Sequence, residues 1–344
     1  MTGNPWWHPA RHIGRRPALL ARGRTQSALR QWFAAAGFEE VDPAALQVSP
    51  GNEAHLHGFA TEALDAAGQG RPMYLHTSPE FAMKKLLAAG ETRIFALTHV
   101  FRNREQTRRH APEFTMLEWY RVGEDYTQLM QDSMELLRLA CAAAGTAHLS
   151  WQGRSCDPAL PPERLTVADA VARHAGIDLL ASIRPDGTTD TKALAAQMTA
   201  KSRRVAPDDT WSDLFSALLV LSEPHLGQGR ATILDHYPAA EAALARRVPG
   251  DARVSERFEL YACGVELANG FGELTDPAEQ RRRFEAEMDE KARVYGHRYP
   301  LDDDFLAALA NMPPASGIAL GFDRLVMLAT HAPHIEDVIW TPIA

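Results

Sequence analysis

Residues 101–121, FRNREQTRRHAPEFTMLEWYR, join a cluster of cations to a segment in which bulky and polar side chains alternate. If the second half is a strand, alternation puts four side chains on one face, namely Phe114, Met116, Glu118 and Tyr120. An aromatic ring, a carboxylate and a phenol suit a stacked base and an amine, while Arg102 and the arginines after it suit phosphate oxygens. Basic loops are usually solvated, and the alternative is a surface loop beside a half-buried strand.

A second cluster, GVELANGFGELTD, contains two carboxylates seven residues apart, Glu266 and Glu273. A regular strand would turn them to opposite faces, so we predict a bulge or kink at Gly270 and Gly272 that brings both to one side. The small residues on the face of Glu266, Ala268 and Gly270, would leave room for a ligand. Two such carboxylates suit Mg²⁺ held by oxygen ligands and substrate phosphates. The alternative is a hairpin with exposed glutamates.

A third segment, GIALGFDRLVM, combines a glycine with an arginine at the point where a strand enters a helix. Gly321 permits close approach of the backbone, and Arg324 is placed for a phosphate contact. The alternative is that Asp323 and Arg324 only cap the helix. Neither G-x-x-x-x-G-K-[ST] nor G-x-G-x-x-G is present, so we expect arginines and metal to bind any phosphates.

The composition is that of an ordinary soluble domain, with 344 residues, 45% of them hydrophobic and 23% charged. A net charge of −8 argues against a chain that wraps duplex nucleic acid. The three cysteines form no C-x-x-C pair and indicate a reducing cytoplasm. Neither a signal peptide nor a membrane-spanning apolar run is indicated.

The periodicity of apolar residues predicts helices and strands in no regular alternation. Helices are expected over residues 17–36, 79–90, 127–144, 277–295 and 325–330, and strands over 72–77, 93–103, 113–122, 231–237, 257–274 and 317–324. Cys263 and Gly264 are expected to form a tight turn. This order favours an α+β fold with an antiparallel sheet, and residues 151–210 are predicted to be a helical insertion without an assigned role.

Taken in order, the three segments resemble the motifs of class II aminoacyl-tRNA synthetases. FRN…HAPEFTMLEWY is similar to motif 2 and GIALGFDR to motif 3, and TSPEF and ELANGFGELTD resemble the lysyl-tRNA synthetase branch. The resemblance covers about residues 17–330 and implies an antiparallel sheet flanked by helices. It implies a catalytic domain over residues 17–344 after an N-terminal extension of residues 1–16, and a homodimer formed through the first helix and the strand after it.

The resemblance also implies a role for individual residues. Arg102 and Arg324 would be the catalytic pair that binds the phosphates of ATP from two sides. Phe114 would stack on adenine, and further ATP contacts would come from Asn103, Glu105, His110, Glu266, Leu267 and Gly321. The lysine-like substrate would be bound by Ser78, Pro79, Glu80, Glu118, Tyr120, Glu273 and Ala319. Glu266 and Glu273 would coordinate Mg²⁺.

Among the relatives of these synthetases, the chain is most similar to a shorter group that attaches β-lysine to a lysine of translation elongation factor P. Only about sixteen residues precede the first core helix, so an anticodon-binding domain has no room and no stable tRNA binding is expected. Ser78 and Ala319 stand where lysyl-tRNA synthetases usually have Ala and Gly. This resemblance implies that (R)-β-lysine is activated by ATP as an adenylate and transferred to the ε-amine of the acceptor.

Two positions depart from the family pattern. Arg104 stands where a glutamate is usual, and Ala111 replaces an asparagine. Two alternatives therefore stay open: a synthetase that uses α-lysine or tRNA, and a non-catalytic paralogue that binds nucleotide for regulation.

Overall fold

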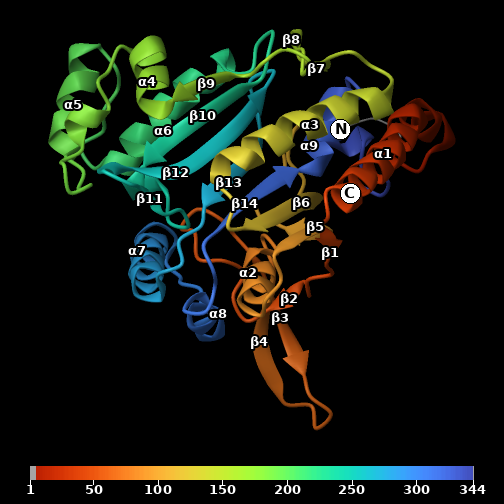
Figure 1. Ribbon diagram of the computed structural model, residues 1–344, viewed down its shortest axis with the longest axis horizontal. Coiled ribbons are helices and arrows are strands. Elements are labelled where there is room, and N and C mark those ends of the chain that lie inside the picture. The colour runs from red at the N-terminus through yellow and green to blue at the C-terminus, as the bar shows by residue number, and fades with distance from the viewer. Residues whose placement is uncertain (1–4, 344) are drawn as a thin grey trace.

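Nine strands form the main sheet of the computed structural model, which describes residues 5–343 (Figure 1). In spatial order they are β1 (Glu39–Glu40), β5 (Arg93–Phe101), β6 (Glu113–Val122), β14 (Ala315–Gly321), β13 (Val265–Gly272), β12 (Asp251–Ala262), β10 (Thr232–Pro238) and β9 (Glu163–Thr166), with β11 (Arg247–Val248) beside β12. Only the β1–β5 and β10–β9 pairs are parallel. The predicted α+β class with an antiparallel sheet is therefore confirmed.

Three helices cover one face of the sheet: α1 (Pro9–Ala35), α3 (Tyr126–Ala144) and α9 (Phe322–Ala329). Their apolar side chains form one core with those of the strands, in which Phe33 stacks on Phe95 with ring centres 4.4 Å apart. The first helix begins at Pro9, whereas the sequence predicted a start at residue 17. Pro17 lies inside the helix, where it removes one backbone hydrogen bond without ending it.

The helices α2 (Glu80–Ala88), α7 (Pro277–Tyr295) and α8 (Asp303–Leu309) pack together beyond the opposite face. Aromatic rings join them, since Phe81 stacks on Phe305 at 4.2 Å and Phe284 lies against both. Helix α2 begins with Glu80, one of the predicted substrate-binding residues, and Pro79 is its N-cap, so this packing fixes their position.

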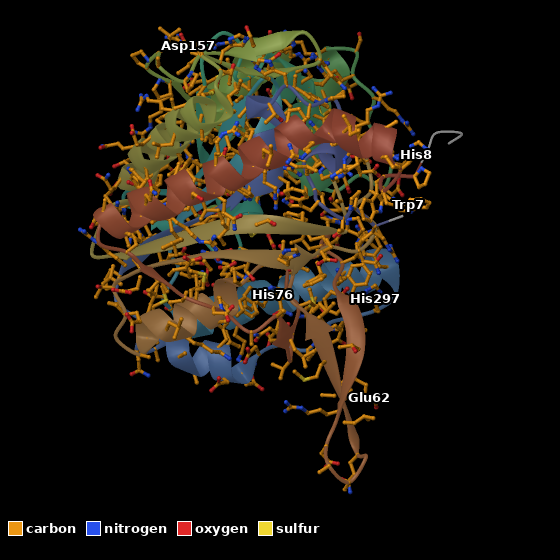
Figure 2. The ribbon with its side chains drawn as sticks, turned by 90° about the vertical axis from the view of Figure 1, so that its right-hand side faces the viewer. Trp7, His8, Glu62, His76, Asp157 and His297 are labelled. Carbon is orange, nitrogen blue, oxygen red and sulfur yellow. The ribbon has the colours of Figure 1, made fainter. Side chains whose placement is uncertain are left out.

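A hairpin of β3 (Phe59–Leu64) and β4 (Gly70–Leu75) extends away from the body of the molecule, with Glu62 along its length (Figure 2). The short strand β2 (Leu46–Gln47) pairs with the base of β4. The sequence predicted a strand just before α2 but not its partner β3. The loop between β2 and β3 contributes to the site described below.

The predicted insertion consists of β9 and the helices α4 (Val167–Ala175), α5 (Thr191–Ala200) and α6 (Trp211–Ser222). These elements surround a separate apolar core that includes Val171, Leu194 and Leu218. They extend to Ser222 and join the main sheet through β9, so the insertion is longer than residues 151–210 and is continuous with the sheet.

The remaining elements are short. A small hairpin pairs β7 (Leu149–Trp151) with β8 (Arg154–Cys156). Four 3₁₀ turns complete the described part of the chain: η1 (Leu180–Ser182), η2 (Glu223–His225), η3 (Ala239–Glu241) and η4 (Ile335–Asp337). Within residues 5–343, no helix has both the length and the apolar character needed to cross a membrane.

Candidate active site

A cleft of about 900 Å³ opens over the centre of the sheet, where β6, β14, β13 and β12 lie side by side. Of the residues predicted from the sequence, nine line it: Ser78, Glu80, Arg102, Phe114, Glu266, Leu267, Ala319, Gly321 and Arg324. These residues come from five segments that are far apart in the sequence. The structure therefore brings the three motifs together in one cavity.

The predicted strand geometry of β6 is confirmed. Phe114 and Met116 line the cleft, whereas Leu117 and Trp119 on the opposite face belong to the apolar core under α3. The pairing of β14 with β6 places Ala319 opposite Glu118, with its methyl group at the floor of the cleft.

Arg102 and Arg324 define one end of the cleft. The Nε of Arg102 donates to the carbonyl of Thr77 at 3.2 Å, and its guanidinium lies 5.5 Å from the centre of the Phe114 ring. Arg324 donates to the carbonyls of Glu266 and Arg109 at 2.9 and 3.3 Å. These hydrogen bonds hold the two guanidinium groups near the Phe114 ring. The arrangement is suited to a nucleoside triphosphate, whose phosphates bind cations and whose base can stack on the ring.

A smaller hollow adjoins this end and is lined by Glu105, His110, Ala111 and Arg324. Burial, followed by the nearby charges of Arg324, Arg109 and Arg102, lowers the pKa of His110 to about 3. His110 is therefore neutral at pH 7. Its Nδ1 lies 2.7 Å from the hydroxyl of Thr107, which holds the ring in place.

A buried cluster of carboxylates lies behind the other end of the cleft, where Ser78 and Glu80 line the wall. Ser78 donates from Oγ to Oε2 of Glu118 at 2.7 Å, and the hydroxyl of Tyr120 donates to Oε1 at 2.5 Å. Both oxygens of Glu118 are thus held, and the residue is 1% exposed. The predicted amine-binding side chains Ser78, Glu118 and Tyr120 are in direct contact with one another.

A buried lysine, which the sequence analysis did not identify, connects the other two carboxylates. The Nζ of Lys84 lies 2.5 Å from Oε1 of Glu80 and 2.6 Å from Oε2 of Glu273. Lys84 is four residues after Glu80 on α2, and this spacing was a sequence signal for the first of these pairs. The second pair joins residues that are far apart in the chain.

We call the part of the site formed by Ser78, Glu80, Glu118, Tyr120 and Glu273 the amine end. It contains fewer cations than carboxylates. Glu80, Glu118 and Glu273 face a single lysine. Burial, and then the charge of Glu80, raises the pKa of Glu118 to about 8, although Tyr120 and Ser78 favour the ionised form. Burial also raises the pKa of Glu273 to about 7 against the attraction of Lys84. A cationic ligand would relieve this imbalance.

Glu266 and Glu273 lie in different surroundings, and their pairing on one Mg²⁺ stays a prediction. Glu266 is in β13 and lines the cleft, whereas Glu273 directly follows the strand. Glu273 pairs with Lys84 at the amine end.

The carboxylate beside Glu266 is that of Glu259 on β12, which also lines the cleft. Burial, and then the charge of Glu259, raises the pKa of Glu266 to about 7. Glu259 accepts hydrogen bonds from Arg257 at 2.7 Å and Tyr261 at 2.6 Å. The Glu266 carboxylate also lies 3.7 Å from the Arg324 guanidinium. Two carboxylates in a cleft with arginines fit the oxygen ligands that Mg²⁺ takes alongside phosphates.

The irregularity that turns Glu266 into the cleft lies elsewhere than predicted. The register of β12 and β13 shifts where Leu260 and Tyr261 pair with Ala268 and Glu266, so Leu267 is the extra residue of a β-bulge. Ala268 and Gly270 consequently face the apolar core, and a Cβ on Gly270 would lie 2.5 Å from the Phe258 ring. The small residues were predicted to line the ligand side, but Asn269 and Phe271 do so instead.

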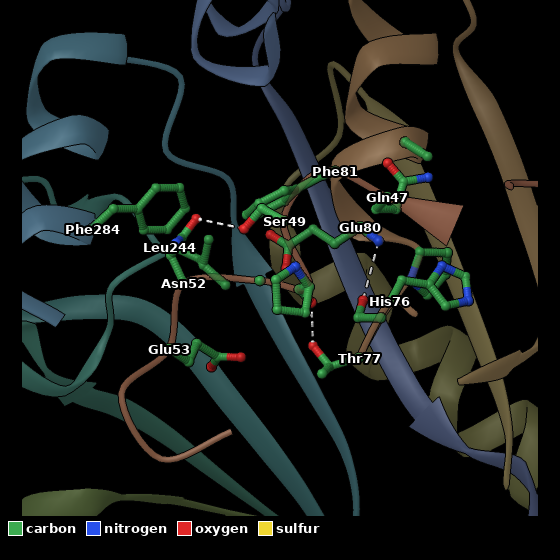
Figure 3. Close-up of a pocket in the computed structure, with 15 residues that line it drawn as sticks. Gln47, Ser49, Asn52, Glu53, His76, Thr77, Glu80, Phe81, Leu244 and Phe284 are labelled. Atoms are coloured by element: carbon green, nitrogen blue, oxygen red, sulfur yellow. Dashed lines mark hydrogen bonds between the residues drawn. The ribbon is translucent and has the colours of Figure 1, made fainter. Parts of the chain in front are cut away.

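The remaining predicted residues lie around the cleft. Pro79 lines a second cavity of about 410 Å³ next to the amine end, together with Asn52, Glu53 and Glu80 (Figure 3). Asn103 is exposed, and its side-chain oxygen accepts from the backbone N–H of Arg104. Arg104 has a left-handed backbone, with φ of 68°, and its guanidinium lies over the Tyr295 ring at 5.6 Å. It therefore contacts α7 and does not line the cleft.

Comparisons with known proteins point to one family. The family model "tRNA synthetases class II (D, K and N)" matches residues 10–344. A protein of Klebsiella pneumoniae named elongation factor P–(R)-β-lysine ligase is 39% identical over 341 residues, which is 98% of both chains. A protein of the same name from Edwardsiella ictaluri is 40% identical over 337 residues, covering 97% of this chain and 96% of the relative.

Proposed function

The chain belongs to the class II tRNA synthetases of the D, K and N type, and on this premise we propose that it attaches (R)-β-lysine to elongation factor P at the expense of ATP. The relatives that carry this name match nearly their whole length. The observation that carries the proposal is a cleft lined by two arginines suited to phosphates, with a carboxylate cluster suited to an amine behind Ser78 and Glu80.

The amine end would bind the substrate through charge. A diamino acid brings two ammonium groups, and with Lys84 these balance Glu80, Glu118 and Glu273. Ser78 and Tyr120 orient Glu118, so its oxygens are fixed before the substrate arrives. An oriented carboxylate loses little conformational freedom on binding, which strengthens the interaction.

The opposite end of the cleft, which is lined by Arg102, Arg324 and Phe114 and is called the arginine end, would bind ATP. Phe114 offers its ring to adenine, while Arg102 and Arg324 approach the phosphates from two sides of the cleft. The substrate carboxylate attacks the α-phosphorus, the bond to the β-phosphate oxygen breaks, and pyrophosphate leaves. The arginines stabilise the negative charge that develops on the phosphate oxygens, and positioning supplies most of the remaining rate.

Glu259 and Glu266 would hold Mg²⁺ together with the phosphates. When bound, the ion neutralises phosphate charge. Arg257 and Tyr261 hold the Glu259 carboxylate toward the cleft, and Arg324 holds the backbone of Glu266. Asn103, Glu105, His110, Leu267 and Gly321 are proposed to complete the nucleotide site.

In the second step the ε-amine of an acceptor lysine attacks the carbonyl of the adenylate and displaces AMP. This step needs no nucleophilic side chain from the ligase. Since the acceptor is a translation factor, we propose a cytoplasmic location. We also propose a homodimer that forms through α1 and β1.

Two other functions compete with this one. A synthetase for α-lysine would need the pocket to accept an amine one carbon closer to the carboxylate, and the Ser78 and Ala319 side chains favour the β position. A regulatory paralogue would be favoured by Arg104 and Ala111, yet the charged residues of both ends of the cleft are present.

Pyrophosphate exchange into ATP tests the proposal. Exchange is expected with (R)-β-lysine and should be much weaker with α-lysine at the same concentration. A preference for α-lysine would support the synthetase alternative, and no exchange with either substrate would support the regulatory one.

A further inference from the structure

One carboxylate in the cleft has no role in the steps above. Glu53 lies in the loop between β2 and β3 and lines both the main cleft and the adjoining cavity of the amine end. Figure 3 shows its carboxylate turned away from its own loop, into the space on the side of Thr77. Among residues 5–343, none forms a hydrogen bond or an ion pair with this carboxylate.

The loop on either side of Glu53 is firmly held. The side chain of Asn52 donates to the carbonyl of Pro300 at 3.2 Å. The backbone N–H of Ala54 donates to Glu287 at 2.8 Å, and its carbonyl accepts from Lys291 at 2.8 Å. The backbone that carries Glu53 is therefore anchored on both sides.

Glu53 stands between the two ends of the cleft. Burial raises the pKa of its carboxyl, the Arg102 guanidinium opposes this increase, and the Glu80 carboxylate adds to it. Its principal charged neighbours are therefore the arginine assigned to phosphate and a carboxylate assigned to amine. The carbonyl of the adenylate must lie between these two ends, because it joins the amine-bearing carbon to the α-phosphate.

The transfer step requires a proton acceptor at this place. A lysine ε-amine has a pKa of about 10.4, so at pH 7 only about one in 2,500 molecules is neutral and able to attack. The other carboxylates of the cleft are engaged: Glu80 and Glu273 with Lys84, Glu118 with Ser78 and Tyr120, and Glu259 and Glu266 with the proposed metal. A carboxylate with a raised pKa and no partner is suited to accept a proton.

We propose that Glu53 is the general base of the transfer step, which takes a proton from the ammonium group of the acceptor lysine as this group enters the cleft. The proposal rests on the function given above. The neutral nitrogen attacks the adenylate carbonyl and forms the carbon–nitrogen bond. The carbon–oxygen bond to the phosphate breaks, and AMP leaves with that electron pair. The nitrogen loses its second proton to the departing phosphate or to water, and Glu53 releases the first proton to water.

The variant Glu53→Gln, which keeps the size of the side chain, separates the two steps. Pyrophosphate exchange with (R)-β-lysine should stay within about threefold of the unmodified protein, because Glu53 does not act in adenylate formation. Transfer from preformed adenylate to elongation factor P, measured in a single turnover, should fall about 100-fold at pH 7. Glu53→Asp, which keeps a carboxylate, should recover part of the rate.

Two further measurements identify the lost function as proton transfer. The transfer rate of Glu53→Gln should rise steadily with pH toward 10, because the acceptor then loses its proton to solvent. With hydroxylamine as acceptor, which is neutral at pH 7, Glu53→Gln and the unmodified protein should form hydroxamate at equal rates. As a control, Glu223→Gln removes another carboxyl whose pKa is raised by burial but which lies outside the cleft lining, and it should change neither step.

The proposal is overturned if Glu53→Gln slows exchange as much as transfer, since Glu53 would then bind the activated substrate or ATP. It is also overturned if Glu53→Gln transfers to elongation factor P at the rate of the unmodified protein. The same holds if Glu53→Gln slows the reaction with hydroxylamine as much as it slows transfer to the protein acceptor. A failure of the proposed function itself is seen separately, because the unmodified protein would then show no exchange with β-lysine.

Discussion

Lys84 and Glu273 form an ion pair, with Nζ 2.6 Å from Oε2, in which the side chains are 0% and 1% exposed. The pair joins α2 to the residue that follows β13, and it places a buried cation next to Glu80, which lines the pocket proposed for a cationic substrate. The protein therefore supplies one of the positive charges that the pocket needs, and the substrate supplies the others.

Loss of this lysine should destabilise the protein strongly. In Lys84→Met, Glu80 and Glu273 lose their shared cation in a buried site, and breaking a buried pair in this way costs about 3–5 kcal/mol. The free energy of unfolding from urea titrations measures the effect. The neighbouring variant Lys85→Met is the control, because Lys85 is 27% exposed and water can replace it beside Asp302, while its second partner Asp304 is 86% exposed, so its loss should cost clearly less. Equal losses in the two variants would contradict the central role of Lys84.

Substrate binding should release protons at pH 7. The pKa of Glu118 is raised to about 8, first by burial, so this carboxyl is mostly protonated in the absence of substrate. An ammonium group beside it favours the carboxylate and lowers its pKa, which expels the proton. Calorimetry of β-lysine binding in buffers of different ionisation enthalpy counts the protons released.

The same titration at pH 9 provides the control. Glu118 is then already ionised, so its proton release should disappear and binding should tighten relative to pH 7. Proton uptake on binding at pH 7, or no change in proton number between the two pH values, would contradict the assignment of Glu118 as an amine ligand.

Glu259 and Glu273 should respond differently to magnesium. Because Glu259 lies beside Glu266, Glu259→Gln should raise the Mg²⁺ concentration needed for half-maximal exchange about tenfold or more. Glu273→Gln should instead raise the KM for β-lysine and leave the Mg²⁺ requirement unchanged. A shifted Mg²⁺ requirement in Glu273→Gln alone would support the metal pair that the sequence suggested.

Gly317 should tolerate no side chain. It lies opposite Tyr120 in the β14–β6 pair, and a Cβ there would stand 2.3 Å from both Glu273 Oε1 and the Tyr120 ring. Gly317→Ala should therefore raise the KM for β-lysine at least tenfold or lower the melting temperature by several degrees. At Gly321 a Cβ meets only the Arg324 side chain, at 3.5 Å, so Gly321→Ala should keep the stability of the protein. Normal β-lysine affinity together with normal stability in Gly317→Ala would show that the pocket walls are looser than described.

The sequence predicts well what depends on local spacing. Alternation along residues 113–122 placed Phe114 and Glu118 on the same side of β6, and the predicted turn at Cys263 and Gly264 has Gly264 at φ 72°, which glycine adopts without steric cost. It predicts less well what depends on distant partners. The bulge at Leu267 is a property of the pairing with β12, so the glycines nearby were a misleading indication.

The same limit applies to individual side chains. Lys84 is significant because Glu273 folds against it from 189 residues further along the chain. Glu53 belongs to a loop whose course is set by Pro300, Glu287 and Lys291, none of which is near in sequence. Arg104 was noted as a departure from the family pattern, and only the structure shows that its side chain lies on Tyr295 of α7.

The most direct test of the account is the intact mass of elongation factor P after incubation with this protein, ATP, Mg²⁺ and (R)-β-lysine. The account predicts the addition of one lysyl unit to one lysine, dependent on ATP, and its loss when Arg102 is replaced by alanine. An unmodified acceptor, under conditions in which the protein is folded and forms the β-lysyl adenylate, would contradict it.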